Sequence, residues 1–240
     1  KYLFESKDKL KGRSYFDKSN KIWYELWCER NFQKFNQIKI INAEIAPNNR
    51  FQIDTNSILG NTKIFSTVLK EDYFDRYYEL LGMLNSKLFN FYHKLIASPK
   101  AGGFFDYKTQ FIEKYPIVFS DNMTIDLISK IILELNDEKI LSSDIKAKIS
   151  FFESIIDGCI FDMYFEEHMK VSNLSITHMV EKEINYVFGK NGFSNINNRK
   201  NTKSIWELYE VLSHPDHPVR NKILKFPIVS PNILKPILQS

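Results

Sequence analysis

The chain has 240 residues, of which 43% are hydrophobic and 26% are charged, and its net charge is +4. These values are typical of a soluble globular protein with a core of its own, and they exclude a disordered or fibrous chain. The two cysteines, Cys28 and Cys159, lie far apart with no Cys or His motif around them. Their placement argues against a disulfide framework or a zinc site and favours a reducing cytoplasm.

No membrane partner is expected from the sequence. It has no apolar run of the roughly 18 residues that cross a bilayer, and its first residues lack the apolar core of a signal peptide. The chain begins with Lys1 rather than Met, so we expect it to be a piece of a longer protein.

The charges are unevenly distributed along the chain. Residues 1–120 carry 19 Lys and Arg against 13 Asp and Glu, residues 121–198 carry 7 against 13, and residues 199–240 carry 7 against 3. DNA binding needs local positive charge rather than a high overall charge. The distribution favours a DNA-facing front half joined to a helical support, with chance asymmetry as the alternative.

The front of the chain predicts short strands. Residues 36–45, 51–53 and 63–69 combine β-branched and aromatic residues with turn signals on either side. The hydrophobic pattern then changes its period, which indicates that the strands are followed by a helix.

One long amphipathic helix is expected over residues 71–98, because leucines and aromatic residues recur there at spacings of three and four. Asp72 is its predicted N-cap, and Pro99 is predicted to end it. A glycine-containing turn follows, and residues 115–120 are expected to form a final short strand. This order predicts an α+β fold with a mixed α/β sheet for a compact domain at 1–120.

Residues 121–240 predict a mostly α-helical C-terminal region that supports the front domain. Helices are expected at 122–137, at 142–169 with Ser143 or Asp144 as the N-cap, at 173–188 and at 202–213. Residues 190–203 are polar and rich in Asn, which is typical of a loop. The tail from Pro215 contains several prolines and is expected to be extended along the surface.

Motifs of the common enzyme classes are missing from the sequence. It contains no glycine-rich nucleotide-binding motif and no HExxH zinc motif. His214 and His217 lie three residues apart without a third ligand nearby, which argues against a metal site. Acidic-x-lysine triplets such as Asp106-Tyr107-Lys108 leave open an Mg²⁺-dependent nuclease. No further acidic residue singles out one triplet, so no catalytic or metal-binding residue is assigned.

Basic, aromatic and glycine residues in the turns of the front domain are the candidates for DNA binding. Arginine can read guanine, lysine neutralises phosphate, and glycine lets a backbone approach a phosphate without a Cβ. The candidates are Lys11, Arg13, Lys21, Arg50, Lys100, Gly102, Gly103, Tyr107 and Lys108. The alternative is that these turns are ordinary surface loops over buried aromatic residues.

Three stretches of the front domain carry a resemblance to a known family. They are LKGRSY…WYELW, then IKIINAEIAPNNRFQID, then YYELLGMLNSKLFNFYHKLIASPKAGGFFDYKTQFIEKYPI. In this order they resemble the C-terminal target recognition domain of TaqI-like adenine-specific DNA methyltransferases and of Type IIG restriction-modification enzymes. They are similar also to the recognition domains of Type I specificity subunits. The resemblance covers roughly residues 1–120.

The resemblance implies a domain that reads a short double-stranded DNA sequence for a methyltransferase domain in the same chain or in a partner subunit. That domain would flip an adenine and methylate it with S-adenosylmethionine, and Mg²⁺ would be required if the parent enzyme also cleaves DNA. The NPPY motif and the cofactor motif of such a domain are missing here. The fragment itself is therefore expected to bind no cofactor and to catalyse nothing.

Two alternatives to DNA recognition remain open at this point. The first is a nuclease centre within the fragment. The second is a protein-interaction module whose helix at 142–169 docks onto a methyltransferase, as a specificity subunit does.

Overall fold

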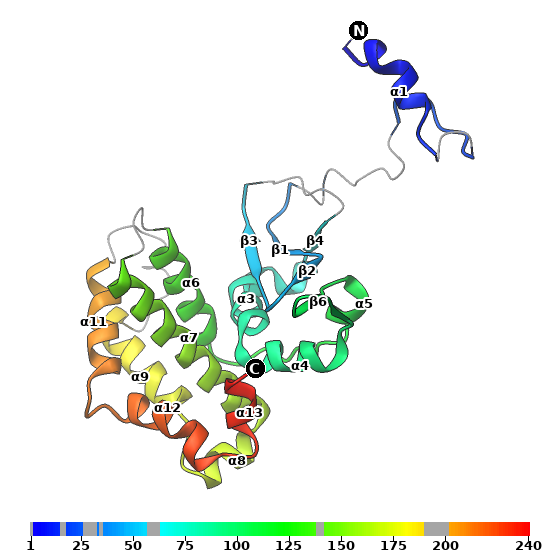
Figure 1. Cartoon of the computed structure of the whole chain (residues 1–240). Coiled ribbons are helices and arrows are strands. Elements are labelled where there is room, and N and C mark those ends of the chain that lie inside the picture. The colour runs from blue at the N-terminus through cyan, green and yellow to red at the C-terminus, as the bar shows by residue number, and fades with distance from the viewer. Residues whose placement is uncertain are drawn as a thin grey trace. The chain divides into compact units, whose positions relative to one another are not determined.

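The computed structural model describes residues 2–14, 18–25, 33, 36–56, 63–137, 142–189 and 202–240. It divides the chain into two compact units, Lys1–Gln37 and Ile38–Ser240 (Figure 1). Each unit is described here by itself. Among the described residues, no helix combines the length and the apolar character needed to span a membrane.

The first unit is small, and its described residues are all exposed or half-buried. It begins with a 3-10 helix, η1 (Tyr2–Ser6), which continues into one short α-helix, α1 (Lys7–Lys11). The rings of Phe4 and Trp23 pack edge to face with their centroids 5.6 Å apart, and the ammonium of Lys7 lies 4.9 Å from the Phe4 ring. None of the described residues of this unit is buried, so its described part has no core of its own.

The second unit contains two antiparallel sheets of three strands each. Their strand orders are β3-β1-β4 and β2-β6-β5. The strands are β1 (Lys39–Ala43), β2 (Ile45–Ala46), β3 (Phe51–Asp54), β4 (Ile64–Thr67), β5 (Pro99–Lys100) and β6 (Phe104–Asp106). The three predicted strand regions are confirmed, although the first is divided into β1 and β2 at Glu44. The final strand predicted at 115–120 is wrong: this segment is irregular, and β6 takes the place beside β2.

A buried ion pair fixes the register of β1 against β3. Lys39 lies opposite Asp54, and its Nζ is 2.5 Å from Asp54 Oδ2, with both side chains almost fully buried. Separating such a pair would leave an uncompensated buried charge, which costs more than the intact pair contributes. A shift of β3 by one residue is therefore strongly disfavoured.

The helix predicted at 71–98 is present but divided. It consists of η2 (Glu71–Arg76), α3 (Tyr77–Asn85) and α4 (Lys87–Ile96). Ser86 has extended backbone angles, and its hydroxyl accepts a hydrogen bond from the N–H of Phe89, so it acts as the N-cap of α4. Serine favours such caps over helix interiors because its side chain competes for backbone hydrogen bonds. The prediction that Asp72 caps one continuous helix is therefore wrong.

The C-terminal half is helical, as predicted. Its helices, together with one short helix before them, are α5 (Thr109–Ile112), α6 (Thr124–Asn136), α7 (Ser143–Tyr164), α8 (Glu166–Val171), α9 (Thr177–Phe188), α11 (Thr202–Ser213), α12 (Pro218–Val229) and α13 (Leu234–Leu238). The helix predicted at 142–169 is divided at Phe165. Its N-cap is Ser142, whose hydroxyl accepts from Ile145 N, and not Ser143 or Asp144. Residues 190–201 of the predicted loop lie outside the described residues.

The prediction of an extended tail is wrong. Residues after Pro215 form α12 and α13, and Pro218 lies at the start of α12. Proline is well tolerated there, because its fixed φ suits a helix and the first N–H groups of a helix have no partner within it. Pro227 lies inside α12 and Pro236 inside α13, so the prolines of this tail do not keep the chain extended.

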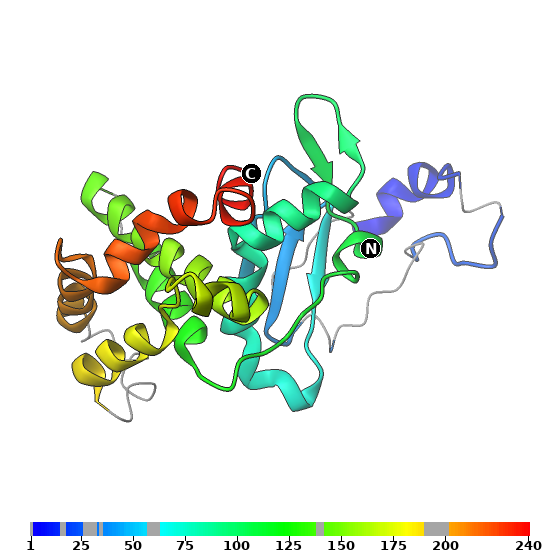
Figure 2. The same cartoon turned by 90° about the horizontal axis from the view of Figure 1, so that it is seen from below.

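One hydrophobic core extends through the second unit. Helix α3 packs against α6, and α6 packs against α7, in a layered arrangement visible in Figures 1 and 2. The carboxylate of Glu79 in α3 accepts hydrogen bonds from the backbone N–H of Ser120 at 2.7 Å and from Nη1 of Arg76 at 3.0 Å. The packing of α3 against α6 crosses residue 120. The division into 1–120 and 121–240 stays a prediction about function, since the packing is continuous there.

Candidate nucleic-acid interface

The β5–β6 hairpin carries the two adjacent glycines that the sequence singled out. Lys100 pairs with Phe104 across the hairpin, and the turn between them contains Gly102 and Gly103 with φ angles of +78° and +77°. Residues with a Cβ rarely adopt these left-handed angles, so the turn favours glycine at both positions. Figure 2 shows the hairpin projecting away from the helices of the second unit.

Five charged side chains form a continuous row beside this hairpin, which we call the charge ladder: Lys63, Glu44, Lys108, Asp106 and Lys100. Lys63 Nζ lies 2.7 Å from Glu44 Oε2, and Lys108 Nζ lies 3.5 Å from Glu44 Oε1. Asp106 Oδ2 lies 3.1 Å from Lys108 Nζ and 3.6 Å from Lys100 Nζ. Each carboxylate is therefore placed between two lysines.

The pairing stabilises the ionised forms of Glu44, Asp106 and Lys108. The hydrogen bond from Lys63 is the main cause that lowers the pKa of Glu44. Burial alone would raise the pKa of Asp106, but hydrogen bonds and charge from Lys108, together with the charge of Lys100, bring it below its usual value. Asp106 and then Glu44 raise the pKa of Lys108. The row therefore holds three positive and two negative charges.

Tyr107 lies beneath the ladder rather than on its surface. It is only 1% exposed, its hydroxyl donates to Asn49 Oδ1 at 2.9 Å, and its ring stacks on His93 with centroids 3.8 Å apart. His93 Nδ1 in turn lies 2.7 Å from the hydroxyl of Tyr115. Tyr107 is thus a core residue, and its placement gives no support to the prediction that its side chain lies beside DNA.

Burial dominates the protonation of this network. It lowers the pKa of His93 to about 4 and raises the pKa of Tyr107 and of Tyr115 above the usual range. These three groups are therefore neutral at physiological pH, and they serve to support the hairpin.

Arg50 is exposed on a loop that is held at both neighbouring positions. The N–H of Asn49 donates to Asn90 Oδ1 at 3.0 Å, and the N–H of Phe51 donates to Asn85 Oδ1 at 2.9 Å. The helix asparagines were not among the predicted residues. Asparagines at the end of α3 and within α4, opposite the PNNR segment, were the signal that could have found them.

The remaining predicted residues belong to the first unit. Lys11 ends α1 and is exposed, and Lys21 is half-buried. Arg13 donates from Nε to the carbonyl of Leu10 at 2.8 Å and from Nη2 to the carbonyl of Trp23 at 2.9 Å. Arg13 thus has a structural role within its unit. Of the nine predicted residues, the structure gathers Lys100, Gly102, Gly103, Tyr107 and Lys108 in and around one hairpin.

Comparison with known families places the hairpin and the ladder in context. Residues 1–117 match the TaqI-like C-terminal specificity domain. These residues belong to that family. The specificity domain thus includes every predicted DNA-binding residue, and its match ends close to the predicted boundary at residue 120.

A curated relative matches about the same length of chain. The Type II methyltransferase M.BanIII of Aneurinibacillus aneurinilyticus is 27% identical over 118 residues, which cover 48% of this chain and 20% of that protein. The match thus spans about a fifth of the length of that methyltransferase.

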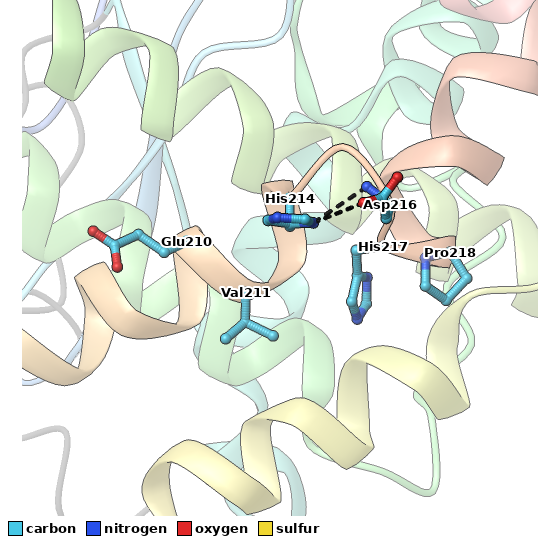
Figure 3. Close-up of a pocket in the computed structure, with 6 residues that line it drawn as sticks. All are labelled: Glu210, Val211, His214, Asp216, His217 and Pro218. Atoms are coloured by element: carbon cyan, nitrogen blue, oxygen red, sulfur yellow. Dashed lines mark hydrogen bonds and ion pairs between the residues drawn. The ribbon is translucent and has the colours of Figure 1, made fainter.

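A pocket of about 480 Å³ lies outside the specificity domain, between α11 and α12 (Figure 3). His214 and His217 line it, but both have structural partners. Nδ1 of His217 accepts the N–H of Val219 at 3.2 Å and so caps α12, and Nδ1 of His214 accepts the N–H of Asp216 at 3.3 Å. These hydrogen bonds account for the placement of both histidine rings, and no metal ion is needed to explain it.

A nuclease centre gains no support from the specificity domain. Asp106 of the DYK triplet is engaged by two lysines. In the helical half, Asp144 of the acidic-x-lysine triplet Asp144-Ile145-Lys146 is paired with Lys148 at 2.5 Å. Over the described residues, no three His, Cys, Asp or Glu side chains are arranged to hold a metal ion.

Proposed function

We propose that this chain binds double-stranded DNA as the target recognition part of a restriction-modification enzyme or adenine-specific DNA methyltransferase. The observation that carries the proposal is the family membership of residues 1–117, because specificity domains determine which DNA sequence an enzyme acts on. The hairpin and the charge ladder lie within these residues and offer lysines to phosphate.

Catalysis belongs to a separate methyltransferase domain, in the same chain or in a partner subunit. The match to one fifth of a Type II methyltransferase supports this arrangement. Such a domain would bring S-adenosylmethionine, with Mg²⁺ where the parent also cleaves DNA. The role of this chain is then to hold the duplex in register, while the other domain extracts and methylates the adenine.

Within the proposed complex, lysines and arginines have different tasks. Lys100 and Lys108 project from the hairpin region and are each 42% exposed, which suits contacts to phosphate oxygens. Arg50 is presented by a loop fixed through Asn85 and Asn90, and a guanidinium held in this way can form a bidentate contact with guanine.

The test is a binding titration of the chain against labelled duplex DNA over a series of KCl concentrations. We expect binding at low salt that weakens steeply as salt rises. Lys100→Gln should weaken binding to every duplex and make the salt dependence shallower by about one phosphate contact. Duplexes selected from a random library and then sequenced would give the recognised bases, and Arg50→Gln should relax the preference at one position of that sequence.

Lys225→Gln is the matched control, because Lys225 is an exposed lysine of α12, outside the specificity domain. Its replacement should leave DNA binding unchanged. Absence of duplex binding at low salt, both by the chain alone and by its complex with the methyltransferase part, would contradict the proposed function.

A further inference from the structure

The charge ladder contains two carboxylates that a phosphate-binding surface does not need. Glu44 and Asp106 lie within 3.6 Å of the ammonium groups of the three lysines, which are the groups that would contact DNA. Two negative charges at this place offset part of the attraction between the lysines and a DNA backbone. Their presence therefore requires an explanation beyond simple phosphate binding.

The carboxylates are largely shielded from solvent, whereas the lysines are exposed. Glu44 donates its backbone N–H to Lys63 O at 2.8 Å and accepts from Tyr107 N at 2.7 Å. Asp106 lies opposite Ile45 in the β2–β6 pairing. The side chains of Glu44 and Asp106 are 14% and 5% exposed, against 69% for Lys63 and 42% for both Lys100 and Lys108. The two carboxylates are thus much less exposed than the three lysine side chains with which they pair.

In this arrangement a carboxylate of the ladder and a phosphate of DNA compete for each lysine. Ion pairs of partly exposed lysines contribute little free energy, because water screens them, so a well-placed phosphate can replace the carboxylate. A DNA backbone that does not fit gains less and still meets the repulsion of the carboxylates. The internal anions therefore reduce binding to unmatched DNA more than binding to matched DNA.

We propose that Glu44 and Asp106 are specificity-determining residues, which act as internal counter-anions of Lys63, Lys108 and Lys100 and suppress binding to DNA of unmatched sequence. This inference rests on the proposed function, since it concerns how the same surface discriminates among DNA duplexes. Glu44 gives the sharper test, because the contacts of its carboxylate with the described residues are with Lys63 and Lys108, whereas Asp106 Oδ1 also accepts the backbone N–H of Lys108.

The experiment compares the chain with its Glu44→Gln variant on a random-sequence duplex of about 20 base pairs. At about 50 mM KCl, where screening is weak, we expect the variant to bind about threefold to fivefold more tightly. Its affinity should also fall more steeply with salt, because the Glu44 carboxylate no longer competes with phosphate for Lys63 and Lys108. On a duplex selected for tight binding the gain should be smaller, so the ratio of specific to unspecific affinity falls.

Two further variants separate charge from position. Glu166→Gln removes the same charge from another lysine pair, with Lys170 on α8, and should leave DNA binding unchanged. The double variant Glu44→Gln/Lys63→Gln restores the net charge of the ladder and should return unspecific affinity close to that of the parent chain. Thermal unfolding of each variant verifies that the fold is kept.

Unchanged or weaker binding of Glu44→Gln to the random duplex, with binding by the parent chain intact, would overturn the inference and leave the proposed function standing. Weaker binding would mean that Glu44 instead orients the lysines for DNA. Loss of binding by the parent chain and by every variant would contradict the proposed function itself and the inference with it.

Discussion

The carboxylate of Asp157 in the middle of α7 accepts a hydrogen bond at 2.7 Å from the backbone N–H of Lys87, the first residue of α4. This contact ties a buried acid of the helical half to a helix start in the specificity domain. The N-terminus of a helix stabilises a negative charge. Burial nevertheless prevails and raises the pKa of Asp157 to about 7.

Asp157→Asn should stabilise the protein at alkaline pH. The folded protein holds a proton on Asp157 up to about pH 7, whereas the unfolded chain releases it near pH 4, so the free energy of unfolding of the parent falls between these values as pH rises. Asparagine keeps the acceptor for Lys87 and has no charge to bury. The gain should approach an upper limit of about 4 kcal/mol above pH 7 and vanish near pH 4. Urea unfolding at several pH values measures it, and a gain that does not depend on pH would contradict it.

His93 should have the opposite effect on stability. Its pKa is lowered to about 4 by burial, so the unfolded chain takes up a proton first as pH falls from about 6.5, and stability is lost over that window. The loss is at most about 3 kcal/mol. Because the Asp157 effect opposes it between pH 4 and 6.5, the loss should be clearest in the Asp157→Asn background. NMR titration of the His93 ring should find no protonation above about pH 5; a midpoint near 6.5 would be inconsistent with its burial.

The hairpin glycines should differ from ordinary surface positions. Gly103→Ala should cost about 1 to 2 kcal/mol, because φ is +77° and alanine avoids this region. No described atom lies within 4 Å of a Cβ added there, so the cost is one of backbone conformation and not of crowding. Asparagine tolerates the left-handed region better, and Gly103→Asn should therefore cost less. Thermal unfolding of the two variants measures both losses of stability. Equal losses would mean that a contact of the added side chain, and not the backbone conformation, causes the cost.

Tyr107→Phe should lower the free energy of unfolding and leave the affinity for DNA unchanged. The variant loses the hydrogen bond to Asn49 Oδ1 and keeps the stacking on His93, so we expect a loss of about 1 kcal/mol. The hydroxyl is buried and points to Asn49, so duplex affinity should stay within experimental error. A marked loss of affinity with stability preserved would restore Tyr107 as a DNA-contacting residue.

Local periodicity made much of the fold predictable. The helices of the C-terminal half follow from apolar residues spaced three and four apart, and the strands around β1 follow from their composition. The break at Ser86 was missed because the apolar pattern continues through it, and only the serine hydroxyl identifies the new helix start. The burial of His93 had a detectable signal, since it lies four residues after the buried Phe89 on the same helix face.

The charge ladder could be predicted only in part. Lys100 and Lys108 are close in sequence, but Glu44 and Lys63 reach them only through the pairing of β2 with β6 and the contact that Glu44 makes with Lys63. Such pairing depends on the whole fold and leaves no local pattern. Tyr107 was predicted to lie beside DNA because it stands next to Lys108, whereas it directly follows β6 and its side chain lies in the core.

The Glu79 and Ser120 contact limits how recognition modules of this kind can be exchanged. The family match ends at residue 117. The hydrophobic core continues past this residue, because α3, which precedes it in the chain, packs against α6, which follows it. A chimaera joined at this residue would have to form the α3 and α6 interface from two foreign sequences, including the close approach of Ser129 to Gly82. Transplanting a new target sequence into a host enzyme should therefore succeed with residues 1–240 moved together, and fail with the matched segment alone.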